Sequence, residues 1–399
     1  MTKTILAFGY IPKSKGGKQL TGLATGIFDL HNTVNLLNTE FKVIIAATDI
    51  HQKKINIENT EVIGWNKFIL IGHILKHPLR CFYFLFKTLQ VQKFRPKNYL
   101  FKFIFLDYAI ELTKPDAIHF HGNSGALLST GLWKKSQKKI LRLHGINGFD
   151  PSIPFYKLQR KLEKFVTGLH FEKVTFVAKG IRDEWEEKFG SFNCEMTTVL
   201  NGYDPNVFAP KKETESWLNG KQYDLITFSG VSERKGQIRV VEAINNLKNE
   251  GIELSYLIIG YGDKNHLEDI KKFVQLHNLN VSFIDYLTQK EIVFYLHQSK
   301  YFILPSITEG FGKVYIESIG AGIPVIIPKH LPLAKEPKIL SEINSLFIDG
   351  TSTESITKGL REIYKKEKLN SNMVISNSVK TLQWGNLATE YLKIYKSIF

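Results

Sequence analysis

The sequence predicts an α/β protein built from two parallel β-sheets, each wrapped by helices. Three observations favour this class. Short β-rich runs alternate with longer helical patterns along the whole chain, which is typical of parallel strands joined by crossover helices. The length of 399 residues suits two or three domains, because one domain takes roughly 150 residues. A stretch rich in proline, glycine and charge, 201–221, lies at the middle of the chain and is typical of a domain boundary.

Each half of the chain holds six runs that are typical of strands. Those in the first half are 4–8, 42–47, 117–121, 139–143, 174–177 and 197–200, and those in the second half are 225–229, 254–259, 281–284, 301–304, 325–327 and 345–348. Amphipathic helices are expected over 261–272 and 289–298. Each half therefore has enough strands for one doubly wound sheet.

The end of the chain is expected to be a packed helix. Trp384, Leu387 and Tyr391 lie three or four residues apart within the segment 382–399, so they share one helix face. We expect this helix to join the first domain. The predicted domains are residues 1–205 together with helix 380–399, and residues 206–379.

Composition excludes several classes of protein. Hydrophobic residues make up 43% of the chain and charged residues 23%, so the chain is neither disordered nor collagen-like. Two cysteines are too few for a disulfide scaffold and suit a reducing compartment. The apolar run 5–10 is too short for a signal peptide, and no run reaches the ~18 residues of a membrane span. We therefore expect a cytoplasmic protein.

Positive charge is concentrated in one half of the chain. Residues 1–200 hold 29 basic and 16 acidic side chains, a net +13, whereas residues 201–399 hold 24 and 22, a net +2. This asymmetry indicates an anionic partner for the first half.

A basic aromatic stretch, residues 66–105, is the main source of this charge. It holds no acidic residue. Its basic residues are Lys67, Lys76, Arg80, Lys87, Lys93, Arg95, Lys97 and Lys102, interleaved with eight phenylalanines and two tyrosines. Basic heads with apolar bodies suit the anionic face of a membrane. The alternative is that the aromatic side chains form a core face and the lysines its solvated side. Nucleic acid is disfavoured, because the stretch matches no binding module.

The most informative segment is 305–325, PSITEGFGKVYIESIGAGIPV. It follows the expected strand 301–304, at the sheet edge where doubly wound proteins bind ligands. Gly310 and Gly312 flank Phe311 and let the backbone approach a ligand. A helix is expected to begin at 312–313, and a helix N-terminus favours phosphate. Glu309 and Glu317, eight residues apart, can reach different hydroxyls of one ligand, although Glu309 can also be an acid that stabilises the helix start.

This segment resembles the signature of retaining glycosyltransferases of family 4, in which E-G-F-G-x-x-x-x-E is followed by A-G-x-P-V. Other segments resemble landmarks of that family in the same order: KPDAIHFHG at 114–122, LHG at 143–145, VLNGYD at 199–204 with Phe208, FSGVSERKG at 228–236, and LIIGYG at 257–262. The resemblance implies the GT-B fold, two Rossmann-like domains that face a central cleft. The second domain would hold a nucleoside-diphosphate sugar and the first domain the acceptor.

The resemblance also assigns roles to single residues. Glu309 would contact the donor sugar and Glu317 the ribose hydroxyls. The other donor-binding residues that it implies are Gly230, Gly260, Gly262, Gly310, Phe311, Gly312, Lys313 and Val314. His144 would lie near the reacting centre of the sugar. One of His119 and His121 is expected to point inward, because strand residues alternate faces.

Two basic residues are expected at the diphosphate. Lys235 matches the lysine of the family's G-R-x-x-x-x-K-G loop, and Arg234 is its expected partner. The loop departs from that pattern, because Val231 follows Gly230 where the family has arginine and the loop is one residue shorter. Fixed positive charge there would stabilise the leaving diphosphate. Near the N-terminus, Gly16 and Gly17 are the favoured glycine loop, with residues 22–26 as the alternative.

Motifs that are missing narrow the function further. The chain has no D-x-D triplet, no P-loop and no G-x-G-x-x-G after the first strand, which disfavours metal-dependent GT-A transferases, P-loop NTPases and dinucleotide oxidoreductases. Histidines on separate strand ends without a carboxylate are not a metal-ligand pattern, so no metal site and no cofactor are expected.

We therefore expect a retaining, metal-independent glycosyltransferase that uses a UDP-sugar or GDP-sugar. Its acceptor would be a glycan or lipid-linked sugar at the cytoplasmic membrane face, in cell-surface polysaccharide synthesis. The chain would be peripheral to that membrane through residues 66–105. Two alternatives remain: a catalytically silent subunit that binds membrane or glycan, and a GT-B-fold sugar-nucleotide epimerase.

Overall fold

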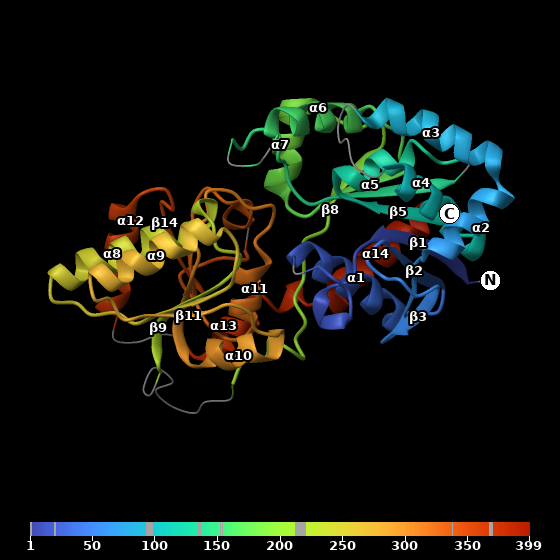
Figure 1. Ribbon diagram of the computed structural model, residues 1–399. Helices are drawn as coiled ribbons and strands as arrows, with labels where there is room; N and C mark the ends of the chain where they lie inside the picture. The colour runs from blue at the N-terminus through green and yellow to red at the C-terminus, as the bar shows by residue number, and fades with distance from the viewer. Residues whose placement is uncertain are drawn as a thin grey trace. The chain divides into compact units, whose positions relative to one another are not determined.

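The computed structural model describes residues 2–19, 21–92, 99–133, 137–151, 153, 155–211, 221–336, 338–366 and 370–399. The chain divides into two compact units, one formed by Met1–Asn201 with Trp384–Phe399 and the other by Gly202–Gln383. Each unit has one mainly parallel sheet with helices around it (Figure 1). The predicted α/β class with two Rossmann-like domains is confirmed.

The first unit is built on an eight-stranded sheet with the order β3-β4-β2-β1-β5-β6-β7-β8. Its strands are β1 (Lys3–Gly9), β2 (Phe41–Ala47), β3 (Lys54–Ile57), β4 (Thr60–Ile63), β5 (Ala117–His121), β6 (Lys138–Leu143), β7 (Lys173–Phe176) and β8 (Glu195–Thr198). Its helices are η1 (Lys13–Lys15), α1 (Gly22–Leu37), α2 (Lys67–Lys76), α3 (Pro78–Gln92), α4 (Tyr99–Thr113), α5 (Gly122–Ser129), α6 (Tyr156–Thr167), α7 (Lys179–Phe189) and α14 (Trp384–Ser397).

The second unit is built on a six-stranded parallel sheet with the order β11-β10-β9-β12-β13-β14. Its strands are β9 (Tyr223–Phe228), β10 (Tyr256–Ile259), β11 (Val281–Ile284), β12 (Ser299–Ile303), β13 (Val325–Pro328) and β14 (Ser345–Ile348). Its helices are η2 (Glu233–Lys235), α8 (Gln237–Asn249), α9 (Lys264–Leu276), α10 (Gln289–His297), α11 (Lys313–Gly320), η3 (Pro332–Lys335), α12 (Thr353–Tyr364), α13 (Asn372–Asn377) and η4 (Lys380–Leu382).

The strand orders decide where ligands can bind. The first sheet reverses its direction of winding between β1 and β5, and the second between β9 and β12. The loops that leave two such neighbouring strands run to opposite faces of the sheet, which opens a crevice at their carboxyl ends. In the second unit these loops hold Lys235 and Glu309.

The C-terminal helix, α14, packs on the first unit. In Figure 1 this red helix lies beside the blue helix α1. Trp384, Leu387 and Tyr391 of α14 are buried in one cluster with Ile5 of β1 and Val43 of β2. The apolar spacing along 382–399 therefore does predict the buried face of this helix.

Two details differ from the expectation. All twelve predicted strands are present, but the β3–β4 hairpin was not predicted. Its turn places Glu58 at φ 52°, a conformation that marks a turn only once the two strands are paired. The predicted start of the helix over 261–272 is wrong, because the Asp263 side chain accepts hydrogen bonds from the backbone N–H of Asn265 and His266 and so begins α9 at Lys264.

The basic aromatic stretch forms α2, α3 and α4, except for residues 93–98, which lie outside the described residues. Helix α4 is largely buried, so the core interpretation is right for it. Helices α2 and α3 instead expose a row of large apolar side chains spaced three or four residues apart, with exposed fractions of 53–85%. We call this row the α2–α3 stripe: Phe68, Ile71, Leu75, Leu79, Phe82, Phe86 and Leu89.

The side of this helix pair that faces α4 carries charged and polar groups beside apolar ones such as Phe84, which stacks on Phe103. Asp107 Oδ2 of α4 lies 2.9 Å from His73 Nε2 and 3.2 Å from Arg80 NH1. Glu111 Oε2 lies 2.6 Å from His77 Nε2. An ordinary surface helix turns its apolar face inward and its charges outward, so the stripe is exposed against the usual preference. Among the described residues, no helix is long and apolar enough to cross a membrane.

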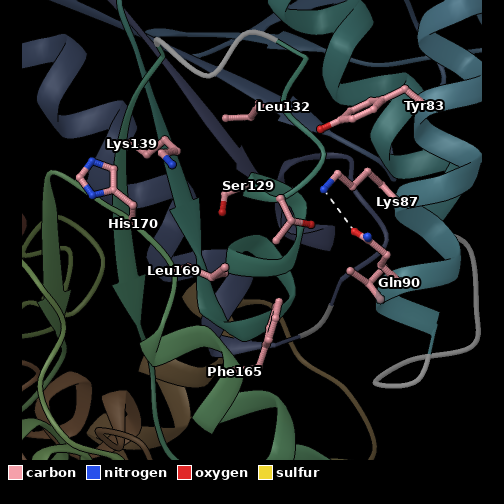
Figure 2. Close-up of a pocket in the computed structure, with 11 residues that line it drawn as sticks. Tyr83, Lys87, Gln90, Ser129, Leu132, Lys139, Phe165, Leu169 and His170 are labelled. Atoms are coloured by element: carbon pink, nitrogen blue, oxygen red, sulfur yellow. Dashed lines mark hydrogen bonds between the residues drawn. The ribbon is translucent and has the colours of Figure 1, made fainter.

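The first unit also contains a cavity of about 680 Å³ beside α3 (Figure 2). Its walls come from α3, the end of α5, the start of β6 and the segment between α6 and β7.

Candidate active site

The loops that follow β9 and β12 are joined through Arg234. The backbone N–H of Ile307 donates to the carbonyl of Arg234 over 2.8 Å. The guanidinium NH1 of Arg234 donates to the carbonyl of Thr308 over 2.7 Å. Arg234 therefore holds the segment before Glu309 in place, while its expected contact with a diphosphate stays a prediction.

Lys235 and Glu309 form an ion pair between these two loops. Both side chains are mostly shielded, with exposed fractions of 15% and 13%. The hydroxyl of Ser306 also donates to Glu309 Oε1, over 2.8 Å. The Lys235 ammonium and the Ser306 hydroxyl thus hold the Glu309 carboxylate in place. The pair lies at the edge of the sheet where the strands end, which is where a ligand anion would bind.

Helix α11 begins directly beyond this pair. Gly312 precedes it at φ 84°, and a Cβ there would lie 2.7 Å from the ring of Tyr315, so the position requires glycine. Gly312, at the N-cap, has no side chain that caps the first turn, and a helix N-terminus of this kind favours an anion. Phe311, 3% exposed, anchors the loop in the core.

Lys313 and Glu317 lie on one face of α11. Lys313 Nζ is 3.4 Å from Glu317 Oε1, and both side chains are less than 10% exposed. Val314 between them is half-buried. Glu317 lies one full turn into the helix, and the Lys313 ammonium holds its carboxylate in place. A carboxylate held in this way can accept a hydrogen bond from a ligand hydroxyl.

The glycines after β10 serve loop packing. A Cβ on Gly260 would lie 1.8 Å from the carbonyl oxygen of Ser229, and one on Gly262 would lie 2.2 Å from that of Val231. The backbones of Val231 and Gly262 pair in a parallel bridge. Gly230 is exposed and has only a carbonyl oxygen at 3.7 Å. Of the three glycines, Gly230 is therefore the one that leaves open space for a ligand.

The N-terminal glycine loop is a closed turn after β1. Gly17 N–H donates to the carbonyl of Pro12 over 3.1 Å. Gly16 has φ 88° with open space beyond its Cα, whereas a Cβ on Gly17 would lie 2.0 Å from the carbonyl oxygen of Ile11. The alternative loop, residues 22–26, lies inside α1, whose first turn is capped by Thr21. The two candidates thus differ in kind: one is a loop and the other is helix.

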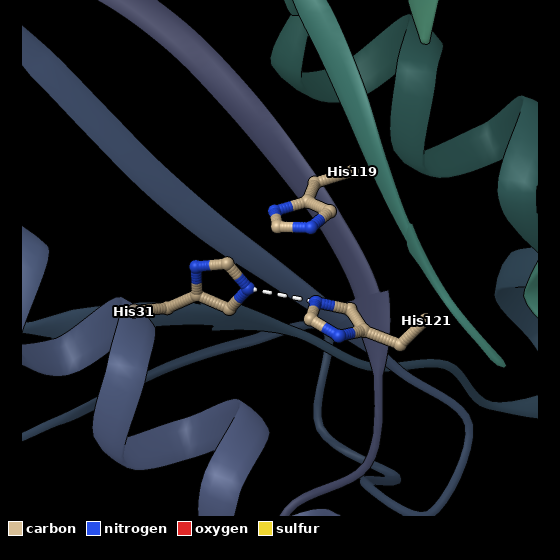
Figure 3. A group of neighbouring side chains, drawn as sticks. All are labelled: His31, His119 and His121. Atoms are coloured by element: carbon tan, nitrogen blue, oxygen red, sulfur yellow. Dashed lines mark hydrogen bonds between the residues drawn. The ribbon is translucent and has the colours of Figure 1, made fainter. Parts of the chain in front are cut away.

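A row of histidines leads from the carboxyl edge of the first sheet into its core, and Figure 3 shows three of them, His31, His119 and His121. His144 Nε2 lies 3.3 Å from His121 Nδ1, and His121 Nε2 lies 2.9 Å from His31 Nε2. The hydroxyl of Tyr395 lies 3.5 Å from His31 Nδ1 and 2.9 Å from His119 Nδ1. We call these five residues the histidine row.

The expectation that only one of His119 and His121 points inward is wrong. Both are buried, at 0% and 7% exposure. They are two residues apart, and strand residues i and i+2 share a face. His31 was not predicted, although its place on the apolar face of α1, 0% exposed, is an unusual one for a polar side chain.

Burial keeps the histidine row neutral. Burial, together with the nearby Arg142 guanidinium, lowers the pKa of His31 to about 3. Burial likewise holds the pKa of His119, His121 and His144 well below the usual imidazole range. The side chains of His31, His119 and His121 lie close enough to share a cation, but the buried positive charge of Arg142 works against one there.

The inner end of the row favours one proton arrangement. His119 Nε2 is buried and has no hydrogen-bond partner in the described part of the chain. An unpaired buried lone pair costs less than an unpaired N–H, so His119 donates from Nδ1 to the Tyr395 hydroxyl. The Tyr395 hydroxyl then donates to His31 Nδ1, and His31 Nε2 donates to His121 Nε2. This leaves His121 Nδ1 as the donor to His144 Nε2. His144 then keeps its own proton on Nδ1 and acts as a hydrogen-bond donor.

The second half of the chain resembles a known protein family. Residues 210–378 match the family model of glycosyl transferases group 1. The amylovoran biosynthesis glycosyltransferase AmsK of Erwinia amylovora is 28% identical over 158 residues, which are 37% of this chain and 37% of that protein. Alignments with three curated relatives cover 62%, 37% and 60% of their own lengths, so the chain spans only part of the proteins it matches.

Solved structures resemble the chain over its whole length. Sucrose-phosphate synthase from Thermosynechococcus elongatus gives a TM-score of 0.76 at 14% identity, covering 100% of this chain and 99% of that one. Anabaena HepE, solved with UDP and glucose, gives a TM-score of 0.69 at 12% identity, covering 99% and 100%. At such identities the likeness concerns the fold, and it confirms the GT-B fold that the motifs implied.

Proposed function

We propose that this chain is a retaining glycosyltransferase of family 4 that takes its sugar from a nucleoside diphosphate. The observation that carries the proposal is the Lys235–Glu309 ion pair beside the uncapped N-terminus of α11, at the switch point of the second sheet. A paired cation, a carboxylate and free N–H groups suit a diphosphate joined to a hydroxyl-rich sugar. The match of residues 210–378 to group 1 glycosyl transferases supports it.

The chemistry follows from these groups. The bond from the sugar's anomeric carbon to the diphosphate oxygen breaks, and negative charge grows on the diphosphate. Lys235 and the N–H groups of α11 stabilise that charge. The acceptor hydroxyl oxygen bonds to the anomeric carbon and passes its proton to the departing diphosphate oxygen. Glu309 holds a sugar hydroxyl and Glu317 the ribose, while His144 donates from Nδ1 to the sugar. Protein cations fill the place that a metal ion takes in other transferases.

The donor is tested by ligand-induced stabilisation. UDP at 100 times its Kd should raise the free energy of unfolding by about 2.7 kcal/mol, seen as a higher Tm of the second unit. The screen compares UDP, GDP, ADP and CMP, each with and without EDTA. We expect UDP to give the largest shift, because HepE was solved with UDP, and EDTA to leave it unchanged.

Two outcomes would contradict this part of the proposal. Stabilisation that EDTA abolishes would mean that a metal ion carries the diphosphate. Stabilisation by none of the four nucleotides would favour the alternative of a catalytically silent subunit.

The acceptor is proposed to lie at an anionic membrane face, in the synthesis of a surface polysaccharide. The α2–α3 stripe supports this, because seven apolar side chains are exposed on helices without a single acidic residue. Lys67, Lys76 and Lys87 lie on the same helices and would meet anionic lipid headgroups. AmsK is named for amylovoran biosynthesis, which is consistent with a polysaccharide role here.

Replacing Phe82 and Phe86 together with serine should abolish membrane binding. Each phenylalanine that enters an apolar phase contributes about 1.5–3 kcal/mol, so the double variant should bind phosphatidylglycerol vesicles at least about 100-fold more weakly in a flotation assay. The matched control replaces Phe294 and Phe347, which are 60% and 44% exposed on the second unit, and should float like the parent. Equal flotation of both double variants would remove the stripe from the proposal.

A further inference from the structure

The cavity beside α3 lies at the sheet edge opposite to the histidine row. Lys139 is the second residue of β6, and His170 precedes β7, so both stand where parallel strands begin. His121 and His144 lie at the other ends of strands β5 and β6. The cavity is therefore separate from the edge at which transfer is proposed, and it has a volume of about 680 Å³.

The charge in this cavity is positive. Lys87, Lys139 and His170 line it, and none of the described residues that line it carries a carboxylate. Figure 2 shows Lys87 and Lys139 entering from opposite sides, with Ser129 between them.

Of the two lysines, Lys139 gives the stronger indication of a bound anion. Burial lowers its pKa, although the carboxylate of Glu172 acts in the opposite direction. Its Nζ lies 5.7 Å from the centre of the Phe171 ring, and no described residue accepts a hydrogen bond from it. A half-buried ammonium without an acceptor is costly. A bound anion would supply the missing partner.

Lys87 is held in a complementary position. Its Nζ donates to Gln90 Oε1 over 3.2 Å and lies 5.5 Å from the centre of the Tyr83 ring. All three residues line the cavity from α3. An exposed amide is a weak partner that an anion can replace.

Helix α3 carries both the cavity wall and the stripe. Tyr83, Lys87 and Gln90 line the cavity, while Phe82, Phe86 and Leu89 belong to the stripe. Each cavity residue therefore directly follows a stripe residue along the helix. A lipid surface that meets the stripe would bring its phosphates to the mouth of a positively charged pocket.

We propose that this cavity is a binding site for the phosphate headgroup of an anionic glycerophospholipid, with Lys87 and Lys139 as its phosphate ligands. The site rests on the proposed contact of the α2–α3 stripe with a membrane. The stripe would insert apolar side chains into any lipid surface and so would not distinguish between lipids. The cavity would select lipids whose phosphate headgroup carries a net negative charge. Leu132 and Leu169 on its walls suit the glycerol backbone next to the phosphate.

The test uses a short-chain phosphatidylglycerol below its micelle concentration, so that no bilayer is needed. Calorimetric titration of the full chain should give saturable one-to-one binding. The variant with Lys87→Gln and Lys139→Gln should bind at least about tenfold more weakly, because two charge-assisted hydrogen bonds are lost. Lys53→Gln is the matched control, since Lys53 is exposed just before β3, outside both the cavity and the α2–α3 stripe, and it should bind like the parent.

Two further arms separate the possible failures. Inorganic phosphate that competes with the lipid at equal affinity would overturn the lipid assignment in favour of free phosphate. The Phe82→Ser, Phe86→Ser variant should keep the short-chain lipid affinity while it loses vesicle flotation. If that variant floats normally, the membrane proposal fails. If the lysine double variant binds the short-chain lipid as tightly as Lys53→Gln does, the headgroup site alone is overturned.

Discussion

Replacing Lys235 with alanine is expected to lower kcat for sugar transfer about 100- to 1,000-fold, because one fixed donor to a developing charge is worth roughly 3–4 kcal/mol. The charge on the leaving diphosphate is largest in the transition state, so the loss should fall on kcat more than on donor affinity. The substitution also leaves Glu309 without its cation, and this carboxylate is only 13% exposed. Initial rates with a saturating nucleotide sugar measure the effect.

The control tests whether the loss of kcat depends on the position of Lys235 and not merely on the loss of one positive charge from the protein. Lys358 of α12 is an exposed lysine of the same unit, and Lys358→Ala should keep the parent's kcat. Circular dichroism and Tm establish that both variants are folded. A Lys235→Ala enzyme with the parent's kcat would show that the ion pair with Glu309 is structural, and the catalytic proposal would then lose its main support.

The placement of the residues expected on the donor side was predictable from sequence, because they lie on short loops at strand ends. The spacing of Glu309, Gly312 and Glu317 fixes a loop followed by one helix face, and local rules decide both. The position of Lys235 next to Glu309 needed one more fact, that β9 and β12 are neighbours. Strand order at a switch point follows from the alternation of strands and helices in the chain.

The histidine row could not be predicted in the same way. It joins α1, β5, β6 and α14, and His31 is 364 residues away from Tyr395 in the chain. No local pattern encodes such a contact. The exposed stripe on α2 and α3 was hidden for another reason. Periodicity shows that apolar residues share a face, but only the packed structure reveals that the polar face carrying His73 and Arg80 was the one turned towards α4.

Lowering the pH from 6.5 to 5 is expected to destabilise the first unit strongly. The pKa of His31 is about 3 in the folded protein and close to 6.5 in an unfolded chain. Between these values the unfolded state binds a proton that the folded state does not, so stability falls as pH falls. At pH 5, His31 alone costs about 2 kcal/mol. His119, His121 and His144 act with the same sign, since burial lowers their pKa as well.

Urea unfolding followed by tryptophan fluorescence measures this effect, because four of the five tryptophans belong to the first unit. The carboxylates of Glu163 and Glu390, whose pKa burial raises, act in the opposite direction but are two groups against four. His31→Gln should reduce the slope of stability against pH by about 1.4 kcal/mol per unit, even if it also lowers stability at pH 7. His170→Gln, at an exposed position, should keep the parent's slope. A parent protein whose stability is flat between pH 6.5 and 5 would mean that the row accepts protons while folded, and His144 would then be charged and unable to act as the neutral donor proposed.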